Sequence, residues 1–175
     1  LNTAFEPWPS FTQQEADVVS RVLLSNKVNY WTGQECREFE KEFASFSDTK
    51  YAVALANGPV ALDVALKALQ IGAGDDVIVT SRTFLASASS IVTAGANPIF
   101  ADVELDSQNI SRRTIEAILT PNTKAIICVH LAGWMCDMDP IMQLAAEKGL
   151  YVIEDCAQAH GAKYKGKPAG SIGHI

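Results

Sequence analysis

The sequence predicts an α/β fold of three layers, αβα, in which helices cover both faces of a mostly parallel sheet. Five short apolar runs typical of buried strands recur along the 175 residues. Most of them are separated by segments with helical periodicity. Alternation of strand and helix is the pattern of βα-repeating proteins, whose parallel sheets are buried on both faces.

The N-terminal part is expected to be mostly helical. Thr12 and Glu15 have the spacing of a capping box ahead of an apolar series, which predicts a first helix. Cysteine and phenylalanine then recur at helical spacing from Cys36 to Phe46, which predicts a second. The run "YAVALA" at 51–56 predicts the first strand.

The rest of the chain alternates regularly. A helix is expected at 59–70, apolar except for a stripe at Asp63, Lys67 and Gln70, so most of its surface should be buried. Further strands are expected at 76–80, 97–103, 124–130 and 151–155. Further helices are expected from about 84 to 93, after Ser111, and from Asp139 as N-cap, with Pro140 as its first residue and Gly149 closing it.

Composition excludes several classes of protein. The chain is 48% hydrophobic, yet no apolar run approaches the roughly 18 residues that a membrane span needs. The formal charge of −6 argues against nucleic acid or an anionic membrane as the main partner. The N-terminus lacks the pattern of a signal peptide. We therefore expect a soluble, cytoplasmic protein.

The four cysteines form no C-x-x-C pair, and two of them, Cys128 and Cys156, lie in or beside apolar runs, so we expect free thiols. Cys128, His130, Cys136, Asp137 and Asp139 are a conceivable set of metal ligands. Their spacing matches no common zinc pattern, so no metal is expected, and His130 is interpreted as a strand-end histidine satisfied by neighbours.

The domain boundary is expected near residue 30. Residues 1–30 are interpreted as an N-terminal arm and first helix that pack across the domain or against a partner, with Trp8 and Trp31 nearby. Residues 31–175 form the main domain. The chain has no initiator Met and stops at Ile175 after a basic, glycine-rich stretch, so we expect it to be incomplete. Lys163, Lys165 and Lys167 in that stretch are typical of a solvated turn.

The candidate site lies where the strands end, because ligands of open α/β sheets bind beyond the carboxyl ends of the strands. The turn "ANGPVA" leads from a strand into a helix, and free N–H groups there favour a phosphate. In "YVIEDCAQ" the apolar residues 151–153 are followed by Glu154 and Asp155. A simple explanation is that Asp155 is a helix N-cap. A phosphate turn, the aromatic Phe84 and the acid Asp155 together suit a flat phosphorylated heterocycle such as pyridoxal phosphate (PLP), whose ring nitrogen takes an acidic partner.

Longer motifs appear in a recognisable order: "ALANGPVALDVALKAL", "GAGDDVIVTSRTFLASAS", "AGANPIFADVE", "TKAIICVHLAG" and "VIEDCAQAHGAKYKGKPAGSIG". They resemble the sugar aminotransferases of the DegT/DnrJ/StrS type over about residues 11–175, and "EDCAQAHGA" is the most specific block. The resemblance implies the N-terminal part of the large domain of the PLP-transferase fold, that of aspartate aminotransferase. It also implies a homodimer with sites at the subunit interface.

The resemblance implies a role for five residues of this sequence. Asp155 matches the acid that pairs with the pyridine nitrogen, and Gln158 matches a residue over or beside the ring. Phe84 matches the aromatic that stacks on the ring. Gly58 and Val60 match the turn whose backbone amides hold the phosphate.

Three departures from the family pattern affect this reading. Pro59 stands where threonine is usual, and it lacks both an N–H and a hydroxyl for the phosphate. Thr80 replaces a frequent proline. The Schiff-base lysine of the family falls beyond Ile175, and none of the lysines at 163, 165 and 167 occupies its position, so no catalytic residue is expected within this chain.

The function that the resemblance implies is transfer of an amino group from an amino acid, usually glutamate, to a keto-sugar nucleotide. Such reactions serve bacterial surface-polysaccharide or secondary-metabolite sugar biosynthesis. A same-fold sugar dehydratase or regulatory relative without the lysine is the nearest alternative. A nicotinamide oxidoreductase is disfavoured because G-x-G-x-x-G is absent, and a catalytically inert binding module gains some support from Pro59.

Overall fold

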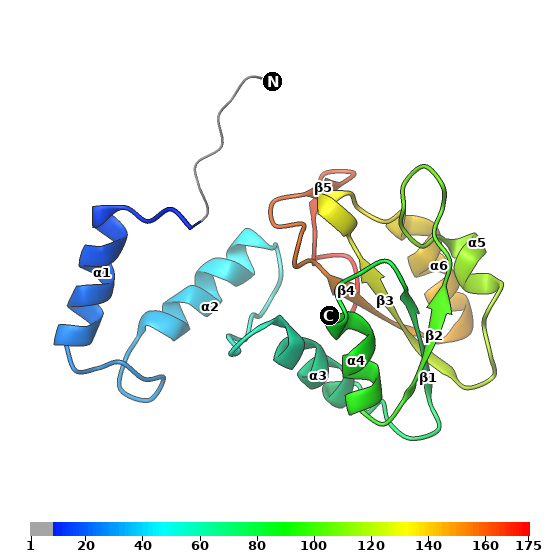
Figure 1. The fold of residues 1–175 in the computed structure, drawn as a ribbon, viewed down its shortest axis with the longest axis horizontal. Helices are drawn as coiled ribbons and strands as arrows, with labels where there is room; N and C mark the ends of the chain where they lie inside the picture. The colour runs from blue at the N-terminus through cyan, green and yellow to red at the C-terminus, as the bar shows by residue number, and fades with distance from the viewer. Residues whose placement is uncertain (1–8) are drawn as a thin grey trace.

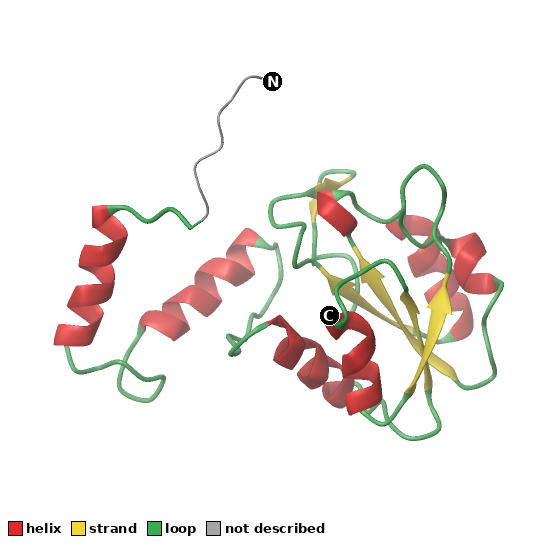
Figure 2. Cartoon of the chain, viewed as in Figure 1, coloured by secondary structure: helices red, strands yellow, loops and turns green. Residues whose placement is uncertain are grey.

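The computed structural model describes residues 9–175, which form a layered body with two helices extending from it (Figures 1 and 2). The body contains a four-stranded sheet in the order β2-β1-β3-β4, and all neighbouring strands are parallel. Its strands are β1 (Asp76–Thr80), β2 (Asn97–Ala101), β3 (Thr123–Val129) and β4 (Tyr151–Asp155). The predicted three-layer α/β class is confirmed, and these strands lie within one or two residues of their expected bounds.

Helices cover both faces of this sheet. Helices α3 (Gly58–Ala68) and α4 (Ala86–Thr93) lie on one, here called the α3/α4 face. Helices α5 (Arg112–Glu116) and α6 (Met138–Lys148) lie on the other, the α5/α6 face.

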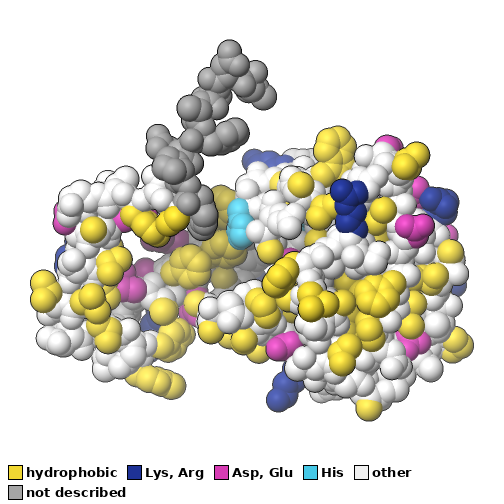
Figure 3. Space-filling view, viewed as in Figure 1, with side chains coloured by type: hydrophobic (Ala, Val, Ile, Leu, Met, Phe, Trp, Pro, Cys, Tyr) yellow, Lys and Arg dark blue, Asp and Glu magenta, His cyan; other side chains and the backbone are white. Residues whose placement is uncertain are grey.

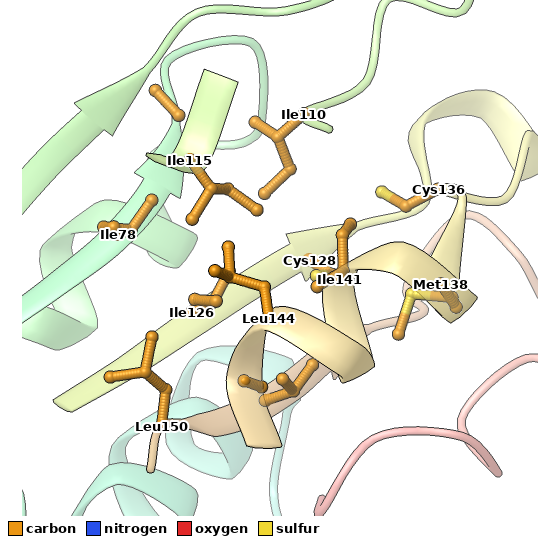
Figure 4. Packing of buried hydrophobic residues seen from close by; sticks show 13 residues of the cluster. Ile78, Ile110, Ile115, Ile126, Cys128, Cys136, Met138, Ile141, Leu144 and Leu150 are labelled. Atoms are coloured by element: carbon orange, nitrogen blue, oxygen red, sulfur yellow. The ribbon is translucent and has the colours of Figure 1, made fainter. Parts of the chain in front are cut away.

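The alternation of side chains along each strand separates two cores. Val77 and Val79 of β1 pack on the α3/α4 face, whereas Ile78 between them packs on the α5/α6 face. Figure 4 shows the second core, where isoleucines of the sheet meet Ile141 and Leu144 of α6. Every residue of β1 is buried, because this strand lies between β2 and β3 with helices on both sides.

Local signals explain several of the helix boundaries. The capping box of α1 (Gln13–Leu24) forms as predicted, since Thr12 accepts from the Glu15 N–H and Glu15 accepts from the Thr12 N–H. Gly149 ends α6 at a φ of +68°, as expected. The expected start of α6 is wrong, because the N-cap is Asp137 and Asp139 and Pro140 already lie in the first turn. Proline is tolerated there because first-turn N–H groups have no helical acceptor.

The strand expected at 51–56 does not form, and no strand of the described residues pairs with this segment. It runs between α2 (Glu35–Phe46) and α3, away from the sheet edge (Figure 1). The N–H of Ala54 donates instead to the Glu40 carboxylate at 2.9 Å. Two of its larger apolar side chains are exposed, at 74% for Tyr51 and 73% for Val53, whereas Ala52 and Ala54 are half-buried.

Exposed apolar side chains also occupy α1 and α3. Helix α1 has no buried residue, and hydrophobic groups lie on the surface over α1 and α2 (Figure 3). Trp31 is 84% exposed, and Trp8 lies outside the described residues. In α3 only Ala65 and Leu66 are buried, so the expectation that most of its surface is covered is wrong for this structure. Within residues 9–30, the described part of the expected arm, no residue is buried.

The chain after β4 forms a small hairpin of β5 (Lys163–Tyr164) and β6 (Lys167–Pro168). Lys163, Lys165 and Lys167 are exposed, which confirms the predicted solvated turn. All four cysteines are free, as expected. None of the helices within residues 9–175 is long and apolar enough to cross a membrane.

Candidate functional site

The two adjacent carboxylates that end β4 point to opposite faces of the sheet. Val152 belongs to the core on the α5/α6 face and Ile153 to the core on the α3/α4 face. Because side chains alternate along a strand, Glu154 follows Val152 and Asp155 follows Ile153. The pair is therefore two separate features, and each has its own partners.

Glu154 is a structural anchor. Its buried carboxylate accepts from His130 Nε2 at 2.9 Å and from the backbone N–H groups of Gly170, Ile172 and Gly173 at 3.1, 2.7 and 2.5 Å. Burial alone would raise the pKa of Glu154, but these hydrogen bonds favour the charged form and lower it below its usual value. The carboxylate thus holds the chain after β6 against the end of β4.

His130 is fully buried and completes this cluster. Its Nδ1 accepts from the Cys136 N–H at 3.1 Å, so Nε2 carries the ring hydrogen and donates to Glu154. This confirms the interpretation of His130 as a strand-end histidine satisfied by neighbours.

The conceivable metal set of the sequence does not assemble. Asp137 accepts from the Tyr164 hydroxyl, and Asp139 pairs with Lys165. Ligand atoms of His130, Glu154 and Cys156 do lie within 4.8 Å of one another. The Glu154 carboxylate, however, already accepts four hydrogen bonds. Its geometry is that of a satisfied buried acceptor, and the expectation of no metal stays a prediction.

Asp155 is half-buried on the α3/α4 face. Its Oδ2 accepts from the hydroxyl of Ser87 in α4 at 2.7 Å, and its Oδ1 accepts from the Ala157 N–H at 3.2 Å. Residues 156–162 form turns, so Asp155 does not cap a helix and that interpretation is wrong. Each carboxylate oxygen keeps a lone pair for another donor.

The N-terminus of α3 has fewer free donors than the sequence suggested. The helix starts at Gly58, so Pro59 is its second residue, and the Val60 N–H donates to Asn57 Oδ1 at 3.0 Å. Of the two amides predicted to hold a phosphate, Gly58 has no acceptor among the described residues and Val60 is occupied. Helix α3 packs on α4, so this N-terminus and Asp155 share one face of the sheet.

Phe84 and Gln158 flank the same strand ends but take different surroundings. Phe84 lies between β1 and α4 and is 70% exposed, so its ring is available for stacking. Gln158 Oε1 accepts from the Ala132 N–H at 2.7 Å. Ala132 lies in the short helical turn η1 (Leu131–Gly133) after β3. The structure thus ties Gln158 to this turn.

Sequence reasoning missed the partners of these residues. Ser87 donates to Asp155 and is itself hydrogen-bonded to Thr83. The Asn109 side chain accepts from the Leu131 N–H and donates to the Trp134 carbonyl, and so contacts both ends of the turn after β3. One signal could have pointed to Ser87: side chains alternate along β4, which places Asp155 on the α3/α4 face, and α4 on that face is rich in serine.

The residues present fit PLP well at one end and incompletely at the other. A carboxylate fixed by two donors, with lone pairs left, suits a protonated ring nitrogen. The α3 N-terminus suits a phosphate through the helix dipole and the Gly58 N–H. Asn57 would have to release the Val60 N–H before that amide could bind a phosphate.

The chain is similar to known aminotransferases in sequence and in fold. A model described as the DegT/DnrJ/EryC1/StrS aminotransferase family matches residues 9–175. The crystal structure of an aminotransferase from Psychrobacter cryohalolentis is 68% identical, with a TM-score of 0.96 over 98% of this chain and 43% of that one. A putative sugar aminotransferase from Streptococcus pneumoniae, solved in its PLP form, is 33% identical. Its TM-score is 0.87 over 99% of this chain and 47% of that one.

A further relative is similar over most of this chain but less than half of its own length. The GDP-perosamine synthase of Caulobacter vibrioides is 50% identical over 94% of this chain and 44% of its own length. The chain therefore spans less than half the length of the curated relatives that it matches.

Proposed function

The chain belongs to the DegT/DnrJ/EryC1/StrS aminotransferase family, and on this premise we propose that the complete protein carrying it is a PLP-dependent sugar aminotransferase. It moves an amino group from an amino acid, glutamate, to a keto-sugar nucleotide. The reaction belongs to cytoplasmic synthesis of amino sugars for a bacterial surface polysaccharide or a secondary metabolite. The names of the relatives support this substrate class.

Each site residue has a defined task in this proposal. PLP, when bound, supplies a ring that withdraws electrons from the carbon bearing the amino group. Asp155 accepts a hydrogen bond from the ring nitrogen and keeps it protonated. Phe84 stacks on the ring, Gly58 with the α3 dipole binds the phosphate, and Gln158 lies beside the ring. The Schiff-base lysine lies outside these 175 residues.

A homodimer with its sites at the subunit interface completes the proposal. The exposed apolar side chains of α1 and of 51–55 support it, because a partner would remove them from water. Phe84 and Val60, both at the strand-end edge of the α3/α4 face, are exposed as well, so such an interface would adjoin the site.

The geometry of Asp155 is the observation that carries the proposal. Glu154, one residue earlier, is consumed by four donors within the chain. Asp155 is instead held by two donors and half-exposed, on the same face as the α3 N-terminus and Phe84. A satisfied structural carboxylate would resemble Glu154.

Replacement of Asp155 in the complete protein tests the function. Glutamate converts bound PLP to its amine form, and the change in absorbance reports a single turnover. We expect Asp155→Ala to slow this turnover by several orders of magnitude, each tenfold being about 1.4 kcal/mol of barrier.

Asp75→Ala is the matched control. Asp75 is also half-buried, and its carboxylate accepts one turn N–H, from Gly72 at 3.0 Å, at the opposite edge of the sheet. Both variants should lose a similar amount of stability without cofactor, and Asp75→Ala should react at the parental rate. Parental turnover in Asp155→Ala would reject the assigned site.

A further inference from the structure

Three side chains form a hydrogen-bonded row that ends on Asp155. Thr83 Oγ1 and Ser87 Oγ are 2.8 Å apart, and Ser87 Oγ is 2.7 Å from Asp155 Oδ2. Ser87 is only 1% exposed, so water does not compete for its hydroxyl. The contact joins residues 68 positions apart in the sequence.

Donor and acceptor roles in this row have one consistent arrangement. An ionised carboxylate only accepts, so the single hydrogen of Ser87 points to Asp155. The Ser87 oxygen then accepts the hydrogen of Thr83. Hydrogen bonds to a charged acceptor are the stronger kind, and each hydroxyl polarises the next.

The row fixes the plane of the Asp155 carboxylate. Ser87 holds Oδ2, and the Ala157 N–H holds Oδ1 at 3.2 Å from the opposite end of the group. A half-exposed carboxylate without these donors would rotate and be solvated. Held by both, it presents its remaining lone pairs in one direction before a ligand arrives, which reduces the ordering that binding requires.

We propose that Ser87, supported by Thr83, is a positioning residue that aims the Asp155 carboxylate at the ring N–H of a bound pyridinium. The proposal rests on the proposed function and deepens it. Ser87 touches no ligand itself and acts through Asp155. A purely structural alternative is that the same contact only joins α4 to β4. Both readings predict some loss of stability, but only positioning depends on the ring nitrogen.

The test compares two ligands of the complete apo-protein by fluorescence titration: PLP, and its 1-deaza analogue with carbon in place of the ring nitrogen. For Ser87→Ala we expect affinity for PLP to fall about tenfold, equivalent to about 1.4 kcal/mol, with affinity for the analogue unchanged. Ser90→Ala is the matched control, a buried serine one turn along α4 whose hydroxyl reaches only the backbone carbonyl of Ser87. It should leave both affinities at parental values.

Thr83 gives a second arm if Ser87→Ala does not fold. Thr83→Val keeps the shape and removes the hydroxyl, so it should weaken PLP binding about threefold and spare the analogue. Thr83→Ser keeps the hydroxyl and should restore the parental affinity. Equal losses for both ligands, or no loss in either hydroxyl deletion, would overturn the positioning role.

The outcomes separate this inference from the function on which it rests. If the parental protein binds PLP no better than the analogue and Asp155→Ala changes nothing, the site assignment fails and the inference fails with it. If Asp155→Ala removes the preference for PLP while Ser87→Ala and Thr83→Val behave like Ser90→Ala, only the inference fails.

Discussion

At the scale of single residues, the strand parity of β4 decides which carboxylate is available for chemistry. The sequence predicted Asp155 as the site residue and could not assign Glu154, because the partners of Glu154 lie 24 residues before it and 16–19 residues after it. Such distant contacts carry no local pattern. The same holds for Ser87, which the sequence places only in a helix.

The first prediction concerns the anchor at Glu154 and its pH dependence. A lowered carboxyl pKa adds stability that is fully present above the unfolded-state value of about 4.3 and is lost as pH falls through the folded-state value. We expect the free energy of unfolding to fall more steeply below about pH 4.3 in the parent than in Glu154→Gln. At pH 7 the variant should be less stable by about 1–3 kcal/mol, because its amide NH2 faces buried donors.

Urea unfolding of parent and variant between about pH 3 and pH 7 checks this. Glu38→Gln on α2 is the control, since Glu38 forms only an exposed pair with Lys41, and its curve should run parallel to the parental one. A difference between parent and Glu154→Gln that stays constant with pH would contradict the linkage.

The second prediction concerns Ala132 in the turn after β3. Ala132 has a φ of +53°, a left-handed conformation that glycine adopts without its steric penalty. Ala132→Gly should therefore raise the free energy of unfolding by about 0.5–1 kcal/mol. Ala61→Gly, in a regular helix, should lower it by about 1 kcal/mol. Thermal or urea unfolding reports both, and changes of the same sign would contradict the strain at Ala132.

At the scale of elements, the sequence predicted those strands whose neighbours lie in the described chain. Strands β1 to β4 are continuous apolar runs, and each has a parallel partner that takes up its backbone groups. Residues 51–56 carry an equally strand-like sequence, but no described strand lies beside them. The pattern of apolar and polar side chains along a segment indicates which side chains are buried. A β-strand also needs a neighbouring strand that accepts its backbone hydrogen bonds. The side-chain pattern does not show whether such a neighbour is present.

The third prediction concerns the start of helix α3. The sequence predicted a phosphate turn, but it did not show that Asn57 occupies the Val60 N–H or that Pro59 is the second helical residue. Pro59→Thr restores an N–H and a hydroxyl at that position. One regained hydrogen bond to a charged group contributes at most about 1.5–3 kcal/mol, so PLP should bind more tightly.

Equilibrium dialysis of the complete protein against PLP measures this change. Pro140→Thr is the control, because Pro140 also lies in a helical first turn but belongs to the α5/α6 face. It should not alter PLP affinity. Unchanged or weaker binding in Pro59→Thr would mean that this proline only helps to start the helix.

At the scale of the whole molecule, the two cores on either face of the described sheet are buried, whereas the apolar side chains of α1 and of residues 51–55 are exposed. The layered body buries its aliphatic side chains on both faces, as the alternation of elements predicted. Helix α1 and residues 51–55 have no such cover from the described part of the chain. The capping box and the apolar series after it predicted the first helix, but whether the arm packs on its own domain or on a partner depends on surfaces that periodicity does not describe. The boundary near residue 30 stays a prediction.

The last prediction concerns the Schiff-base lysine and the three lysines of the β5–β6 hairpin. A Schiff base forms from a neutral amine held beside the aldehyde. Lys163, Lys165 and Lys167 are all exposed on the β5–β6 hairpin, and a hydrogen bond to Asp139 raises the pKa of Lys165, which keeps it protonated. We also expect, from the resemblance to the family, that none of them occupies the position of the Schiff-base lysine. Borohydride reduction of the 175-residue chain with PLP, followed by peptide mapping, should therefore yield only scattered, substoichiometric labelling. The complete protein, treated identically, should give one stoichiometric pyridoxyl-lysine outside this sequence, and a single stoichiometric label within it would show that the reactive lysine has been misplaced.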